Sequence, residues 1–198
     1  SNEQAFQWLD LWPDWDVPAI IIYGETGCGK SHLVRLFSTK SGGLLVTPSL
    51  LEKLGIYKIL EEVKICILDD AEIGFEEEYL LHLFNALVST GGQVLMTAKK
   101  PPGEWGLSLL DLESRLKSIP CVKIGSPDDR LLEAVFAKHF SDRQLLVGSD
   151  VVSYLIPRME RSLSMVQKIV EEIDKVSLSS GRKVTLPLVR KILESEIV

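Results

Sequence analysis

The chain has 198 residues, of which 45% are hydrophobic and 25% charged, and its formal net charge is −6. This composition suits one substantial core with a small additional unit, and the excess of 17 acidic over 11 basic residues before Ser126 disfavours a nucleic-acid binder. No apolar run reaches the roughly 18 residues that cross a bilayer, and no leader-like segment opens the chain, so we expect a cytoplasmic protein with no membrane partner. Cys28, Cys66 and Cys121 have neither disulfide nor zinc spacing, which fits a reducing compartment.

Short apolar runs alternate with helical patterns through the first two thirds of the chain. The runs predict strands at 19–23, 44–47, 65–69, 93–98 and 121–124. The clearest helical pattern covers 76–90, with three glutamates in its first turn, where the helix dipole favours negative charge. This alternation predicts an α/β fold, a parallel five-stranded sheet with helices on both faces.

The pattern changes after Ile124. The stretch SPDD predicts a helix start with Ser126 as N-cap and Pro127 in the first position. From there the chain shows only helical patterns, at about 127–141, 149–156, 161–179 and 185–195. We therefore expect two domains, an α/β nucleotide-binding domain at 1–125 and a small helical domain at 126–198.

The stretch GETGCGKSH, residues 24–32, follows the first predicted strand and opens a helix. It matches the phosphate-loop pattern G-x-x-x-x-G-K-[ST], in which glycines let backbone N–H groups point at phosphates. Lys30 is placed to reach the β- and γ-phosphate oxygens, and the Ser31 hydroxyl to ligate Mg²⁺. The residues expected to hold ATP or ADP here are Gly24, Glu25, Thr26, Gly27, Cys28, Gly29, Lys30, Ser31 and His32.

Two acids end the third predicted strand, in ICILDDAE. A phosphate loop needs a metal-holding acid on a neighbouring strand, and Asp69 is placed for this role, with Asp70 next to it to orient the attacking water. Aspartate is shorter than the glutamate that many ATPases use at the second position. We therefore expect at most slow hydrolysis.

Two arginines could stabilise the charge of a transferring phosphoryl group, although a solvated ion pair is the default for each. Arg115 lies in SLLDLESRLKSIP, after a Ser108-x-x-Asp111 capping box, and could reach the nucleotide of a neighbouring subunit. Arg161 opens the long helix at 161–179 and could reach the phosphates of its own chain.

Together these motifs resemble the AAA+ domain of the bacterial replication initiator DnaA and its shortened relative Hda, over nearly the whole chain. The resemblance rests on GETGCGKSHL, ILDDAE, MTAKKPPGEW, LESRL and the run from PRMERSL to RKVTLPLVRKIL. It implies the sheet order 5-1-4-3-2, a nucleotide held between the sheet domain and a helical lid, Arg115 as the arginine finger, and Arg161 as a second nucleotide sensor.

The resemblance is greatest to Hda, because no helix-turn-helix segment follows the lid in this sequence, and we expect no sequence-specific DNA binding. It implies a nucleotide-bound regulator that, held by the sliding clamp, promotes ATP hydrolysis by DnaA with an arginine finger supplied in trans. Such a protein limits chromosomal replication initiation. Self-association stays open.

Two features depart from this family. Lys99 stands in AKKPP where members usually carry an acid, and Thr97 just before it either replaces that polar contact or is structural. No glutamine-led clamp-binding peptide is evident near the N-terminus. Either the clamp-binding segment is missing from this sequence, or the protein does not use the clamp.

Two other functions fit the phosphate loop less well. A nucleotide-gated adaptor or helicase loader predicts a basic loop, which the acidic first half disfavours. A metabolic P-loop kinase predicts a lid inserted within the α/β core, whereas the extra helices here follow the last strand. The tryptophans either wall an adenine pocket or pack over the sheet, and we favour packing for Trp8, Trp12 and Trp15.

Overall fold

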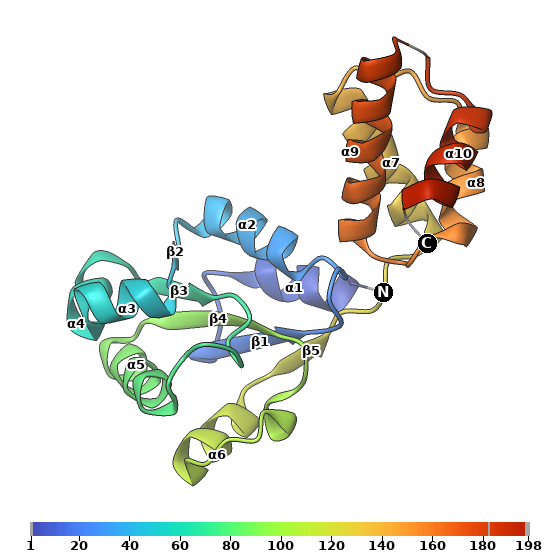
Figure 1. Cartoon of the computed structure of the whole chain (residues 1–198). Coiled ribbons are helices and arrows are strands. Elements are labelled where there is room, and N and C mark those ends of the chain that lie inside the picture. Colours follow the sequence, from blue (N-terminus) through green and yellow to red (C-terminus); the bar gives the residue numbers. More distant parts are fainter. Residues whose placement is uncertain (1, 182, 197–198) are drawn as a thin grey trace. The chain divides into compact units, whose positions relative to one another are not determined.

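The computed structural model describes residues 2–181 and 183–196, and the chain divides between Gly125 and Ser126 into two compact units (Figure 1). The first unit contains a sheet with helices on both of its faces. The second contains only helices. This is the fold class that the sequence predicts.

The sheet has five parallel strands in the order β2-β3-β4-β1-β5, which confirms the predicted order. The strand bounds are β1 Ala19–Tyr23, β2 Leu44–Leu45, β3 Ile65–Leu68, β4 Gln93–Ala98 and β5 Cys121–Lys123. β1 lies between β4 and β5, and Ala19 to Ile22 are fully buried. Burial on both faces explains why this strand reads as an unbroken apolar run.

Alternate residues of the central strands serve two separate cores. Ile21 packs in a cluster with side chains of α3 (Pro48–Leu54), α4 (Ile56–Glu62), α5 (Glu77–Thr90) and α6 (Leu110–Ser118). Ile20 and Ile22 pack on the other face with α1 (Glu3–Leu11) and α2 (Lys30–Ser41). Successive strand residues point to opposite faces, so α2 and α6 lie on opposite faces of the sheet (Figure 1).

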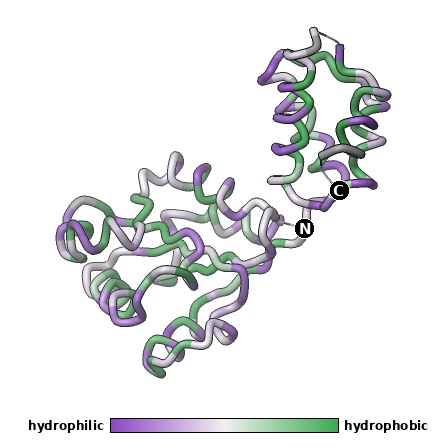
Figure 2. Tube along the Cα trace, in the orientation of Figure 1, coloured by the Kyte–Doolittle hydropathy of each residue, from purple (hydrophilic) through white to green (hydrophobic). Residues whose placement is uncertain are grey.

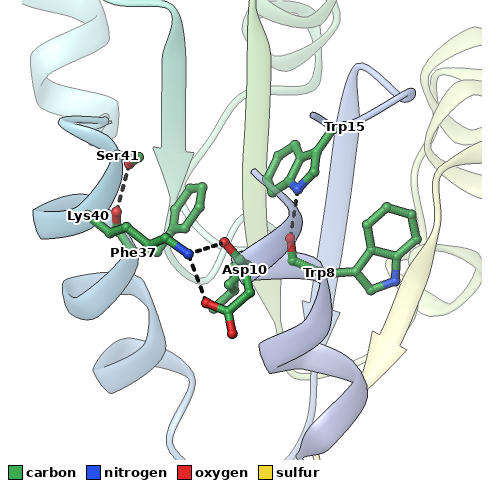
Figure 3. Close-up of polar contacts among 7 residues, drawn as sticks. Trp8, Asp10, Trp15, Phe37, Lys40 and Ser41 are labelled. Carbon is green, nitrogen blue, oxygen red and sulfur yellow. Dashed lines mark hydrogen bonds and ion pairs between the residues drawn. The ribbon is translucent and has the colours of Figure 1, made fainter. Parts of the chain in front are cut away.

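Contacts of Trp15 and Asp10 hold α1 and the segment after it against α2 (Figure 3). Trp15 is 7% exposed, its ring stacks on Phe37 of α2 at a centroid distance of 5.6 Å, and its Nε1–H donates to the Trp8 carbonyl at 2.7 Å. Lys40 of α2 pairs with Asp10 of α1 at 2.8 Å. The packing interpretation is therefore confirmed for Trp15.

The helical unit contains α7 (Asp129–Asp142), α8 (Ser149–Leu155), α9 (Leu163–Ser180) and α10 (Leu186–Glu196). A short 3-10 helix, η2 (Ile156–Arg158), follows α8, and another, η1 (Pro102–Glu104), precedes α6 in the first unit. Apolar and hydrophilic stretches alternate along the helices of this unit (Figure 2). Their apolar sides form one core, with Phe136, Leu155 and Ile173 at its centre.

The predicted helix start at Ser126 and Pro127 is wrong. α7 begins at Asp129, and its N-cap is Asp128, whose carboxylate accepts a hydrogen bond from the Leu131 N–H at 2.9 Å. A carboxylate gains from the helix dipole as well as from the hydrogen bond. Asp128 therefore displaces the serine two residues earlier.

Within the described residues, no helix is long and apolar enough to cross a membrane.

The three cysteines should differ in reactivity. Cys28 and Cys66 are buried, and burial raises the pKa of the Cys66 thiol to about 12. Cys121 is exposed on β5, but partial desolvation raises the pKa of its thiol to about 11. In the native protein only Cys121 should react with a thiol reagent, slowly at pH 8 and faster as the pH approaches 11, because the thiolate is the nucleophile.

Labelling followed by peptide mass mapping checks this order. Rapid native labelling of Cys28 would contradict it.

Candidate functional site

The glycine-rich turn between β1 and α2 has a backbone conformation that excludes residues with a side chain at its glycine positions. A Cβ atom on Gly24 would lie 2.5 Å from the Ile124 carbonyl oxygen, which is backbone and cannot give way. Gly27 and Gly29 have φ angles of 79° and 111°, a region that L side chains rarely adopt. Each glycine of the motif is therefore required by the turn itself.

Lys30 is held inside this turn. It is only 6% exposed, and its ammonium donates to the Gly24 carbonyl at 2.7 Å and to the Glu25 carbonyl at 3.2 Å. α2 starts at Lys30, so the N-terminal end of a twelve-residue helix opens beside the buried cation. The lysine and the helix dipole together give this turn the electrostatics of an anion site.

Cys28 packs beneath the turn and contributes no reactive group. It is 2% exposed, and a Cβ on Gly24 would lie 3.0 Å from its Sγ. Burial raises the pKa of its thiol, although the charge of Lys30 acts in the opposite direction. The neutral thiol therefore fills space.

Thr97 joins the end of β3 to the end of β4. Its hydroxyl donates to Asp69 Oδ1 and accepts a hydrogen bond from the Asp70 N–H at 2.9 Å. The Thr97 carbonyl accepts from the Ala71 N–H at 2.8 Å, and Thr97 itself is fully buried. Asp70 has a φ of 52°, so the chain turns sharply directly after the first acid. Thr97 is thus structural and also contacts the predicted metal-holding carboxylate.

Glu72 was not singled out by the sequence reasoning. Its Oε1 accepts a hydrogen bond from the Lys99 N–H at 2.7 Å, so it binds the turn after β4 through the backbone. Its Oε2 is buried and has no hydrogen-bond partner among the described residues. The Lys99 residue is exposed. The only signal in the sequence was the position of Glu72 two residues after Asp70.

The strand order brings these pieces to one edge of the sheet. β4 lies between β3 and β1, so Thr97, near the end of β4, has Asp69 on the β3 side and the glycine-rich turn on the β1 side. The Gly24 N–H donates to the Ala98 carbonyl at 3.1 Å. The carboxyl ends of parallel strands form the usual ligand-binding edge of such sheets. Across the described ranges, however, no hydrogen bond joins Lys30 or Ser31 to Asp69 or Asp70.

The donor atoms at this edge fit Mg²⁺ better than a transition metal. Ser31 is exposed at the start of α2, and Asp69 offers a carboxylate oxygen besides the one bound by Thr97. No group of three or more histidine, cysteine or acidic side chains able to hold a metal occurs in the described part of the chain. Mg²⁺ commonly binds through one or two protein oxygens, with phosphates and water completing its coordination.

Arg115 lies on α6, across the sheet from α2. Its Nε donates to Asp111 Oδ1 one turn earlier at 3.0 Å, and its side chain is 41% exposed. The predicted Ser108–Asp111 capping box is wrong, because α6 starts at Leu110 with no side-chain cap of its own. The Ser108 N–H instead donates to the carboxylate of Glu77, on α5, which a sequence pattern of local spacing cannot reveal.

Arg161 pairs with Asp129 within the helical unit. The next residue, Ser162, is the N-cap of α9 and accepts from the Met165 N–H at 3.1 Å. Arg161 therefore directly precedes the capped start of α9, and its side chain is 49% exposed. Its ion pair with Asp129 connects this position to the start of α7.

Comparisons with known proteins give a family match for the helical unit and one relative over most of the chain. Residues 128–193 match the family described as "Hda, lid domain". An uncharacterized protein of Haemophilus influenzae is 29% identical over 192 residues, covering 91% of this chain and 83% of that protein.

The solved structures of similar fold include replication proteins. Domain III of the Thermotoga maritima replication initiation protein DnaA has a TM-score of 0.81 at 17% identity, over 98% of this chain and 91% of that chain. AMPPCP-bound DnaA from Aquifex aeolicus scores 0.74 at 18% identity, over 99% and 66%. The Thermotoga maritima RuvB Holliday junction branch migration motor scores 0.75 at 15% identity, over 98% and 69%. At these identities the likeness establishes the fold.

Replacing Thr97 with valine should weaken Mg²⁺-dependent ATP binding by roughly 10- to 100-fold, the usual cost of losing a partner that orients a metal-binding carboxylate. Valine keeps the buried shape but removes the hydroxyl shared by Asp69 and the Asp70 N–H. Titration calorimetry with ATP, with and without Mg²⁺, measures the effect. Thr97→Ser is the matched control and should bind as the wild type does; equal affinity in Thr97→Val would contradict the assignment.

Proposed function

We propose that this chain, which has the fold of DnaA domain III and whose residues 128–193 match the Hda lid domain family, is a nucleotide-dependent regulator that promotes ATP hydrolysis by the replication initiator DnaA. The observation that carries the proposal is the position of Arg115. It lies on an exposed part of α6, and α6 packs on the opposite face of the sheet from α2, which begins with Lys30. An arginine so placed suits a nucleotide held by another molecule.

We assign the chain's own nucleotide, ADP or ATP, to the carboxyl edge of the sheet. The N–H groups of the glycine-rich turn would bind phosphate oxygens, and the Lys30 ammonium, which now donates to the Gly24 and Glu25 carbonyls, would donate to the β- and γ-phosphates. Ser31 and Asp69 would hold Mg²⁺, whose charge would neutralise that of the phosphates. Arg161 of the lid senses the bound nucleotide. The AMPPCP-bound DnaA structures of similar fold support nucleotide binding by this chain.

Asp70 limits the chain's own hydrolysis in this proposal. Its short side chain follows a backbone N–H fixed on the Thr97 hydroxyl, which restrains how far the carboxylate extends toward an attacking water. The nucleotide then serves as a conformational ligand rather than as a rapidly consumed substrate. Its role is to hold the shape in which Arg115 faces the partner.

In the partner's site, the Arg115 guanidinium stabilises the charge that develops on the transferring phosphoryl group. Arginine fingers supplied in trans accelerate such reactions by about 10³-fold or more. The substrate of the stimulated reaction is thus the ATP bound to DnaA, and the chain contributes one side chain to it.

Lys30→Ala should weaken binding of ATP and ADP by about 10- to 100-fold, because it removes a charge-assisted hydrogen bond to phosphate. Lys40→Ala is the matched control, since Lys40 lies on the same helix and pairs with Asp10 at the surface. Equilibrium binding of a fluorescent nucleotide measures both. If Lys30→Ala binds as tightly as Lys40→Ala does, the phosphate cradle is refuted.

Arg115→Ala should lower the stimulated hydrolysis of DnaA-bound ATP toward the unassisted rate. Phosphate release from ATP-loaded DnaA, mixed with this protein in the presence and absence of sliding clamp, measures it. Lys117→Ala is the matched control, because Lys117 lies on the same helix in a similar ion pair, with Glu113 at 2.7 Å. The regulatory function fails if the wild type accelerates nothing, or if Arg115→Ala accelerates as well as Lys117→Ala does.

A further inference from the structure

We infer that Glu77 is a positioning residue that fixes α6, and through it the Arg115 guanidinium. The inference rests on the proposed function for the role of Arg115, and on contacts within the α/β unit for the role of Glu77. Glu77 belongs to α5 and precedes Ser108 by 31 positions, so the contact is made by the tertiary fold.

Among the described residues, the Glu77 carboxylate accepts hydrogen bonds only from the two residues that precede α6. The Ser108 N–H lies 3.0 Å from each carboxylate oxygen, the Ser108 hydroxyl 3.0 Å from Oε1, and the Leu109 N–H 2.7 Å from Oε2. These hydrogen bonds lower the pKa of Glu77, with the two backbone donors as the main cause. The side chain is therefore a carboxylate at neutral pH.

This carboxylate accepts the N–H of the N-cap residue of α6, the hydrogen bond that a glutamate at the third helical position makes in a capping box. Leu109 occupies the N-cap position and offers no side-chain acceptor. Glu77 supplies both the acceptor and a negative charge where the helix dipole favours one. The start of α6 is consequently tied to the first turn of α5 rather than to its own sequence.

Three contacts then determine where Arg115 lies. Glu77 sets the position of α6 along its axis, and the buried side chains Leu112 and Leu116, 0% and 1% exposed, set its rotation. Asp111 restrains the Arg115 side chain through Nε. Loss of the Glu77 contacts releases the first of these constraints, and displacements of about 1 Å in a catalytic arrangement cost up to about 100-fold in rate.

The chain provides a close control beside Glu77. Glu78 is the next residue of the same helix turn, is exposed, and makes no hydrogen bond to the described residues before α6. Glu77→Gln and Glu78→Gln remove the same charge from the same helix. Only the first replaces one of the two oxygens that accept from Ser108 and Leu109 with an NH2 group, which cannot accept.

The experiment measures hydrolysis of DnaA-bound ATP at increasing concentrations of each variant. Glu77→Gln should lower the maximal stimulated rate by roughly tenfold while changing its own ATP affinity less than twofold, and Glu78→Gln should match the wild type. Added to Arg115→Ala, Glu77→Gln should cause no further loss, because its effect passes through that side chain.

The outcomes separate the inference from the function on which it rests. If Arg115→Ala stimulates as the wild type does, the proposed function fails. If Arg115→Ala is inactive but Glu77→Gln matches Glu78→Gln, the function stands and the inference is wrong. The inference is also overturned if Glu77→Gln weakens the chain's own ATP binding as much as it slows stimulation, since Glu77 would then support the whole unit.

Discussion

The pairing of β1 between β4 and β5 is the constraint on which the remaining structure depends. Five residues of β1 pair with β4, and three pair with β5. This pairing places the end of β1 so close to the Ile124 carbonyl that only glycine fits at position 24. The chain must therefore leave the sheet through a glycine-rich turn, and α2 starts with its N-terminal end open at the sheet edge.

The same strand order gives Thr97 its significance. β4 separates β3 from β1, so its end contacts the acids after β3 through the Thr97 hydroxyl and the turn after β1 through the Ala98 carbonyl. Thr97 bonds Asp69 and Asp70 together, and Glu72 bonds the next turn through the Lys99 N–H. The unusual lysine at 99 is thus accommodated by a backbone contact that any residue there could make.

Arg115 lies on the other face of the sheet in the same unit. α6 packs through Leu112 and Leu116 on the face opposite α2, and its start is held by a carboxylate of α5. The proposed nucleotide cradle and the proposed arginine finger therefore lie on opposite faces of one sheet. The division suits a protein that keeps its own nucleotide and acts on that of another.

The sequence by itself determined the strands, their burial and the glycine-rich turn, because apolar runs, glycines and a lysine at fixed spacing are local properties of the chain. It also determined that helices follow Ile124, although it misplaced the first of them by choosing Ser126 over Asp128 as the cap. The N-cap is the residue whose side-chain oxygen accepts a hydrogen bond from the first turn of the helix. A sequence pattern does not tell which of several nearby Ser or Asp side chains makes that bond.

Only the tertiary structure decided the contacts that connect distant segments. Thr97 meets Asp69 across 28 positions, and Glu77 meets Ser108 across 31. Such hydrogen bonds follow from strand order and helix packing, which bring side chains together without leaving a periodic mark in the sequence. The sequence alone identifies Arg115 as a candidate, but the contact between Glu77 and the start of α6 follows only from the fold.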